Sequence, residues 1–144
     1  RGRLYLADVD AATKPRIEAN YLGDADGFDL KVMRECVRLS REIIAQPAFA
    51  PFRGDELLPG ARIRDVDGID AFIRRKAESI YHPVGTCAMG ADGDANAVVD
   101  PQLRVRGVDG LRVVDASVMP KLIGGNTNAP TIMIAERAAD LIAG

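Results

Sequence analysis

The 144-residue sequence predicts an α+β fold, formed as a single domain over residues 1–144. Three observations support this class. Apolar and polar residues alternate near the amino end, as they do in short strands. Two segments in the middle repeat their apolar residues at helical spacing. A short apolar run and a last helical pattern then follow, so strands and helices do not alternate regularly as they would in an α/β protein.

Two short strands are expected at the amino end. In residues 1–8, Leu4 and Leu6 alternate with polar neighbours, which is the pattern of a strand with one apolar face. Residues 15–22 form the second candidate strand, and they end before Gly23, a typical turn residue.

Two amphipathic helices are expected next. Asp24 or Asp26 can cap the first, which continues to the residue before Pro47. Its basic residues are expected to point outward, and its apolar face consists of Leu30, Met33, Val37, Ile43 and Ile44. A loop rich in proline and glycine leads to the second helix, residues 65–79, which is expected to bury Ile69, Phe72, Ile73 and Ile80.

The remaining elements are one strand and one helix. LRVVD, residues 111–115, is a short apolar run that predicts a buried strand. An irregular loop follows, and Asn128 is expected to cap the last helix, with Pro130 in its first turn. The apolar positions of this helix are Ile132, Ile134, Ala135, Ala138 and Leu141.

Composition and charge exclude several classes of function. A net charge of −2 and a pI near 5.4 provide no basic surface for nucleic acid. No apolar run reaches the roughly 20 residues of a membrane-spanning helix. Cys36 and Cys87 do not form a metal-type pair, and two such thiols fit a reducing cytoplasm. The start at Arg1 rather than at a methionine indicates a piece of a longer chain.

The sequence YHPVGTCAMG, residues 81–90, contains the only histidine. Imidazole is the side chain best suited to accept or release a proton between pH 5 and 8. Pro83 restricts the backbone of His82, and Gly85 allows another group to approach the loop closely. His82 is therefore a candidate acid–base residue, and a structural histidine bonded to a carbonyl group is the alternative.

A second unusual segment, GGNTNAP, covers residues 124–130. Two glycines and two asparagines stand where the last helix is expected to begin. The first turn of a helix has free N–H groups and the equivalent of about half a positive charge. This end can hold an anion, or a centre that becomes negative during a reaction. An ordinary capped turn is the alternative.

Other chemistries lack the residues they require. One histidine and two separated cysteines cannot supply the ligands of a zinc site. Residues 92–96, DGDAN, resemble the start of a calcium-binding loop, but Ala97 and Leu103 stand where glycine and glutamate are needed. No G-x-S-x-G, G-x-G-x-x-G or P-loop sequence is present, so the sequence predicts no serine hydrolase and no phosphate cradle. We therefore expect no metal site.

Three segments carry a resemblance to a known family: HPVGTCAMG, VVDPQLRVRGVDGLRVVDASVMP and GGNTNAPTIMIAERAADLI. In this order they resemble the carboxy-terminal part of the glucose–methanol–choline (GMC) oxidoreductases, which are FAD-dependent alcohol dehydrogenases and oxidases. The third segment is most similar to the choline dehydrogenase-like and aliphatic alcohol dehydrogenase branch. The resemblance implies the substrate lobe of the GMC fold, an antiparallel sheet with packed helices. A last strand and helix would belong with the FAD lobe.

The resemblance also implies a role for each candidate residue. In the family, the histidine of this loop takes the hydroxyl proton of the alcohol while a hydride passes from the substrate carbon to flavin N5. His82 matches this histidine. Asn126 matches its partner, which can donate a hydrogen bond to the substrate oxygen but cannot titrate. Contacts with FAD would come from Asp115, Ala116, Asn126, Thr127 and Asn128.

The chain departs from the family because it lacks the dinucleotide-binding fingerprint of the amino-terminal part. We therefore expect the isolated chain to be inactive and to bind FAD weakly or not at all without the missing FAD-binding portion. Uncovered surfaces, residues 111–115 and the last helix among them, would favour self-association. The full-length alcohol-oxidising enzyme would be cytoplasmic or peripheral to a membrane. The alternative is a stand-alone α+β binding or structural module without catalysis.

Overall fold

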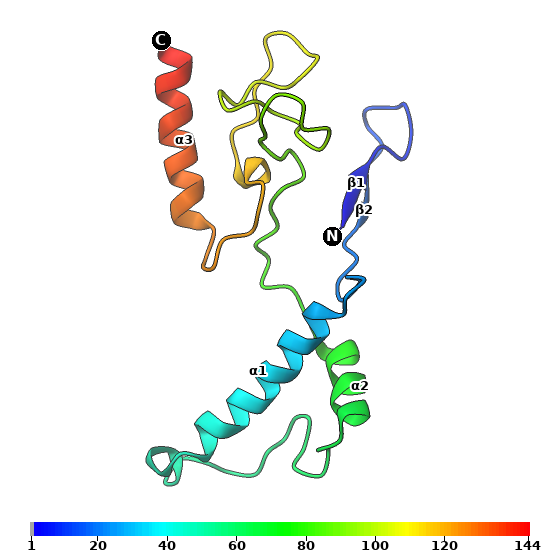
Figure 1. The fold of residues 1–144 in the computed structure, drawn as a ribbon, viewed down its shortest axis with the longest axis vertical. Coiled ribbons are helices and arrows are strands. Elements are labelled where there is room, and N and C mark those ends of the chain that lie inside the picture. Colours follow the sequence, from blue (N-terminus) through cyan, green and yellow to red (C-terminus); the bar gives the residue numbers. More distant parts are fainter. Residues whose placement is uncertain (1) are drawn as a thin grey trace. The chain divides into compact units, whose positions relative to one another are not determined.

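The computed structural model describes residues 2–144, and in this part of the chain the expected α+β class is confirmed (Figure 1). The elements are β1 (Arg3–Tyr5), β2 (Arg16–Glu18), α1 (Phe28–Ala45), α2 (Val66–Lys76) and α3 (Asn128–Ala143), with short 3-10 helices at Pro47–Phe49 and Ala116–Val118. The chain divides into two compact units, one ending at Glu78 and the other running from Ser79 to Gly144.

β1 and β2 pair as a two-stranded antiparallel sheet. Leu4 lies opposite Ile17 in its register, and the Tyr5 hydroxyl donates a 2.7 Å hydrogen bond to Glu18 across the pair. Every residue of both strands is exposed. Cross-strand contacts rather than a core therefore hold this hairpin, and each strand is three residues long, shorter than the sequence pattern predicts.

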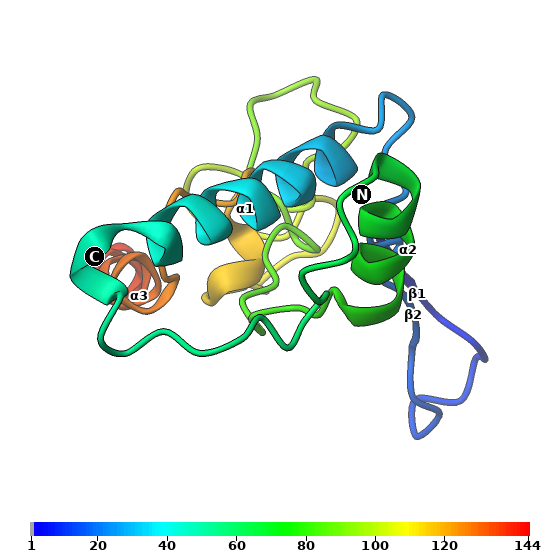
Figure 2. The same cartoon turned by 90° about the horizontal axis from the view of Figure 1, so that it is seen from below.

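α1 and α2 contact each other in the first unit (Figures 1 and 2). The carboxylate of Asp24 accepts from the amide of Phe28 at the start of α1, as predicted, and Asp65 accepts from the amide of Gly68 at 2.9 Å at the start of α2. α2 ends at Lys76 and not near residue 79, because Ala77 adopts an extended backbone. The predicted burial of Ile80 is wrong for the same reason, since that side chain is 73% exposed.

The orientation of α1 differs in part from the amphipathic pattern. Arg34, expected to point outward, forms a bidentate ion pair with Asp70 of α2. Arg41 lies against the connection between the helices, where it pairs with Glu56 and donates to the carbonyl of Ile63, both at 2.8 Å. Ile43 and Ile44, expected to be inside, are 54% and 45% exposed. Periodicity shows which residues share a face, but polar partners on α2 and on the connection decide which face is covered.

Replacing Arg41 by methionine is expected to lower the free energy of unfolding by about 1–3 kcal/mol, because the Glu56 carboxylate and the Ile63 carbonyl lose a charged donor. Urea denaturation followed by circular dichroism measures this change. Arg38→Met is the matched control, since Arg38 is half-exposed and pairs with Glu35 and Glu42 of its own helix. Its expected cost is much smaller, because exposed ion pairs within one helix contribute little, and equal costs for the two variants would contradict the assignment.

The ion pair between the two helices makes stability depend on pH. Hydrogen bonds from Arg34, and then its charge, hold the pKa of Asp70 below the usual value of 3.8. Because the folded-state pKa is the lower one, the stabilisation is complete above the unfolded-state pKa and is lost as pH falls through the folded-state pKa. Acid unfolding between about pH 6 and pH 2 is therefore expected to show a weaker pH dependence for Asp70→Asn than for the unchanged chain. Superimposable pH profiles for Asp70→Asn and the unchanged chain would contradict a contribution of Asp70 to the pH dependence.

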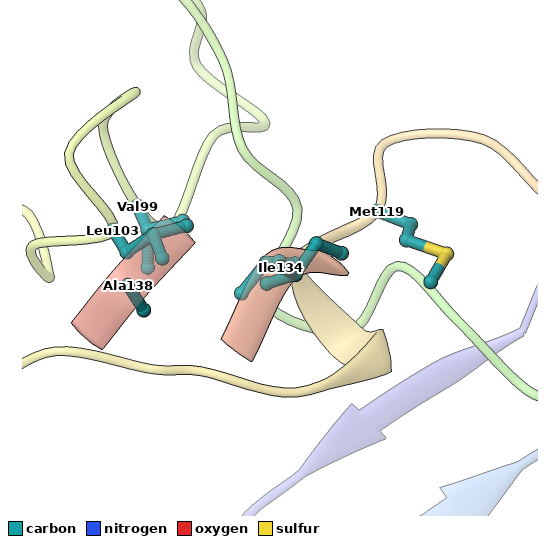
Figure 3. Packing of buried hydrophobic residues seen from close by; sticks show 6 residues of the cluster. Val99, Leu103, Met119, Ile134 and Ala138 are labelled. Carbon is teal, nitrogen blue, oxygen red and sulfur yellow. The ribbon is translucent and has the colours of Figure 1, made fainter. Parts of the chain in front are cut away.

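The second unit consists of turns, isolated bridges and α3. The bridges connect Met89 to Val99 and Val99 to Val105, which brings distant parts of the unit together. Its buried cluster contains Val99, Leu103, Val118, Met119, Ile134 and Ala138. Figure 3 shows Val99 and Leu103 gathered at Ala138 of α3. One side of α3 is thereby fixed to the segments that precede it.

The strand predicted for residues 111–115 does not form. Arg112 makes a single isolated bridge with Arg104, and the chain leaves the extended conformation after Asp115, where the 3-10 helix Ala116–Val118 begins. An apolar run becomes a strand only where its backbone groups find a continuous ladder on a neighbour. Within residues 2–144, the neighbouring segment pairs with this run only at Arg104. A single bridge therefore forms in place of the expected last strand.

Candidate active site

The candidate residues lie in three segments of the second unit. We call them the histidine loop (residues 81–90), the aspartate turn (residues 115–119) and the asparagine segment (residues 124–128). All three fall between Ser79 and Gly144, so their contacts belong to one compact unit.

His82 is half-buried, and Nδ1 of its ring is hydrogen bonded to the carbonyl oxygen of Ile80. A carbonyl oxygen can only accept a hydrogen bond, so Nδ1 must carry the proton. The neutral ring then has its free lone pair on Nε2, the form in which histidine accepts a proton from another group. This bond is the carbonyl contact of a structural histidine, and it is also the contact that orients a general base.

The residue before His82 has an unusual backbone conformation. Tyr81 has a φ of 60°, in the left-handed region, which costs a residue with a Cβ about 1–2 kcal/mol. Its amide donates to the Ser79 hydroxyl oxygen at 3.0 Å, which offsets part of that cost. The turn lets the His82 ring reach back to Ile80. Sequence reasoning missed it because left-handed residues are usually glycine or asparagine, although strained backbone often accompanies functional sites.

Two backbone hydrogen bonds join the histidine loop to the aspartate turn. The amide of Cys87 donates to the carbonyl of Ser117 at 3.0 Å, and the amide of Met89 donates to the next carbonyl along the turn at 2.9 Å. Gly85 has a φ of 87°, and a Cβ at this position would lie 3.3 Å from the carbonyl oxygen of Met119. The close approach expected at Gly85 is therefore found, and the approaching group is the protein backbone.

The aspartate turn is closed by its own side chains. One carboxylate oxygen of Asp115, Oδ1, accepts from the amide of Ser117 at 2.8 Å and also from the Ser117 hydroxyl. Ala116 is half-buried at the start of the 3-10 helix, and Val118 is fully buried at 0% exposure. Asp115 itself is exposed. The hydrogen bonds of Asp115 thus close the turn, and the buried Val118 fixes the turn to the core.

The start of α3 differs by one residue from the prediction. α3 begins at Asn128, and Thr127 takes the capping position without making a side-chain cap. The Thr127 side chain is instead buried, at 8% exposure, and it accepts no hydrogen bond from the amides of the first turn. The carbonyl of Thr127 accepts from the amide and the hydroxyl of Thr131, at 3.1 and 2.6 Å. Asn126 and Asn128 are exposed on either side of it.

The core cluster connects these segments without a direct bond between the two candidate catalytic residues. Val118 belongs to the aspartate turn and Ile134 to α3, and both are members of the cluster. Within residues 2–144, no hydrogen bond joins His82 to Asn126. Their convergence on one substrate oxygen therefore remains a prediction.

The family model of the GMC oxidoreductases matches residues 1–135. This chain belongs to the GMC oxidoreductases. The matching part of the family is the carboxy-terminal domain, as the three sequence segments indicated.

The GMC relatives are considerably longer than this chain. Mitochondrial choline dehydrogenase of Homo sapiens is 56% identical over 143 residues, which are 99% of this chain and 24% of that protein. Pyridoxine 4-oxidase from Mesorbium loti, a solved structure, has a TM-score of 0.86 at 36% identity and covers 96% of this chain and 26% of its own. An FAD-dependent oxidoreductase from Chaetomium thermophilum has a TM-score of 0.88 at 31% identity, over 98% and 24%. The chain spans about a quarter of the length of these relatives.

The asparagine segment of this GMC chain fits one edge of a flavin. A Cβ at Gly124 or Gly125 would meet nothing within 4 Å, so a ligand can approach the backbone there. Asn126 and Asn128 expose amide donors, and α3 adds the positive end of a 16-residue helix. Such donors suit the carbonyl groups and ring nitrogens of an isoalloxazine. The sequence contains no glycine-rich phosphate cradle, so these residues fit part of FAD and not all of it.

Neither a metal-binding cluster nor a membrane-spanning helix occurs in the part of the chain that the structure describes. Residues 2–144 contain no group of three or more histidine, cysteine, aspartate or glutamate side chains placed to hold a metal ion. None of the described helices combines the length and the apolar character that a membrane crossing requires. Cys36 is exposed on α1 and Cys87 is half-buried in the histidine loop, so the two thiols belong to different units.

Proposed function

We propose that residues 1–144 are the carboxy-terminal part of an FAD-dependent oxidoreductase that oxidises the CH–OH group of an alcohol, with His82 as the acid–base residue. The observation that carries the proposal is the hydrogen bond from Nδ1 of His82 to the Ile80 carbonyl, which leaves Nε2 free to accept a proton. Membership of the GMC oxidoreductases supports the reaction class.

The candidate residues of this chain have separate roles in such a reaction. Nε2 of His82 takes the hydroxyl proton of the alcohol. The amide of Asn126 donates a hydrogen bond to the same oxygen and holds it in place while its negative charge develops. Bound FAD would supply a hydride acceptor, so that loss of the proton and of one hydride converts the alcohol to a carbonyl product. Asp115, Ala116, Thr127 and Asn128 would hold the cofactor together with Asn126.

A small alcohol of the choline type is the substrate we propose. The human relative at 56% identity is a choline dehydrogenase, and its identity extends over 99% of this chain. Much of the substrate pocket would come from the FAD-binding portion of the complete protein, because residues 1–144 correspond to about a quarter of the relatives. We also propose that this portion is the principal partner of the chain. A cytoplasmic or membrane-peripheral location of the complete protein remains a prediction.

The test is to express the complete reading frame that contains residues 1–144 and to compare it with the 144-residue chain. The complete protein is expected to purify with bound FAD, and choline or another primary alcohol is expected to bleach the flavin absorbance without oxygen. The 144-residue chain is expected to be colourless and inactive. A complete protein that contains no flavin, or whose flavin no alcohol in the panel reduces, would overturn the proposal.

A further inference from the structure

We infer that Ser117 is a positioning residue for His82, acting through the histidine loop and not through contact with substrate or cofactor. This inference rests on the proposed function of His82. Ser117 is a small residue in the aspartate turn, in which Asp115 and Ala116 are the residues expected to contact FAD.

Ser117 forms hydrogen bonds both within the aspartate turn and to the histidine loop. Its amide and its hydroxyl both donate to Oδ1 of Asp115, so its own side chain closes the turn. Its carbonyl oxygen accepts from the amide of Cys87 in the histidine loop, at 3.0 Å. The bond made by the hydroxyl therefore helps to set the direction of the carbonyl to which the loop is attached.

The aspartate turn is more deeply buried than the histidine loop. Val118 and Met119, which follow Ser117, are 0% and 5% exposed in the core cluster. Residues of the histidine loop are at most half-buried, and Val84 and Met89 pack against the edge of that cluster. Backbone hydrogen bonds with residues 98–99 also hold the end of the loop at Ala88 and Gly90, and the bond of Cys87 to the Ser117 carbonyl is the attachment nearest to His82.

The attachment leaves the loop little freedom between Cys87 and His82. A Cβ at Gly85 would lie 3.3 Å from the Met119 carbonyl oxygen, so loop and turn are already in close contact there. A small rotation of the Ser117 carbonyl must then shift the loop or break its bond. Catalysis is sensitive to such shifts, because a general base works only within hydrogen-bond reach of its proton.

Hydrogen exchange followed by mass spectrometry tests the attachment directly in the complete protein. In Ser117→Ala, the peptide that covers residues 84–90 is expected to exchange on the order of 10-fold faster, because the Cys87 and Met89 amides lose protection. Ser117→Thr keeps a hydroxyl and is expected to retain most of the protection. Ser40→Ala, which removes a serine hydroxyl from α1, is the matched control and is expected to change nothing in this peptide.

Kinetics provide the second measurement. Ser117→Ala is expected to lower the rate of flavin reduction by alcohol between about 10- and 100-fold, with KM and flavin content unchanged and with recovery in Ser117→Thr. A purely structural role would instead accelerate exchange throughout residues 79–144, including α3, and lower the flavin content. That pattern, or unchanged exchange in residues 84–90, would overturn the inference. If the unchanged protein reduces no flavin, the proposed function fails, while the exchange measurement still decides whether Ser117 holds the loop.

Discussion

Replacing His82 by alanine in the complete protein is expected to slow the reduction of flavin by alcohol about 10²–10⁴-fold. His82 is the only histidine of residues 1–144, and its Nδ1–H bond to Ile80 leaves Nε2 as the acceptor for the hydroxyl proton. No other imidazole of this chain can take over that role. Anaerobic stopped-flow absorbance measures the rate, and the flavin content of the purified variant shows whether the cofactor site has survived.

Chemical rescue separates lost proton transfer from lost structure. Imidazole added to the His82→Ala protein can enter the space left by the side chain and is expected to restore part of the rate. The restoration should grow with the concentration of neutral imidazole. A variant that keeps its flavin and reduces it within about threefold of the normal rate would show that His82 is not the base.

Replacing Ile134 by alanine is expected to lower the free energy of unfolding of the second unit by about 2–5 kcal/mol. Ile134 is 9% exposed and joins α3 to the cluster that contains Val118 of the aspartate turn. Truncation therefore leaves a cavity at the point where α3 is fixed. Urea denaturation of the 144-residue chain, followed by circular dichroism at one protein concentration, measures the loss.

The matched control lies two residues earlier on the same helix. Ile132 is 54% exposed, so Ile132→Ala removes the same atoms from a site with much less packing. Its expected cost is about 0.5 kcal/mol. Equal costs at both positions would mean that the cluster does not anchor α3 and does not place the asparagine segment.

The helices were the most predictable part of the fold. Apolar residues at helical spacing, an aspartate before each of α1 and α2, and Pro47 after α1 are local signals, and they placed both helices closely. The run over residues 111–115 misled because strand formation depends on a neighbouring ladder, which is a non-local property. For α3, the sequence did not indicate that Thr127 is buried and occupies the capping position that was expected for Asn128.

The candidate site was predictable in its residues more than in its geometry. The histidine loop and the asparagine segment stand out by composition, so His82 and Asn126 could be selected from the sequence. The left-handed Tyr81 and the Ser117–Cys87 hydrogen bond could not, because both depend on how the backbone folds around the loop. Both features affect the orientation of the imidazole ring, and no sequence pattern predicts that orientation.

We expect the His82 ring and the Asn126 amide to act on the same substrate oxygen, and a double-mutant cycle measures this most directly. Flavin reduction rates are compared for His82→Ala, Asn126→Ala and the double variant of the complete protein. If the two side chains share one oxygen, the double variant should lose at least about 5-fold less than the product of the single losses. Losses that multiply to within about twofold would mean that the two residues act independently, which contradicts the claim.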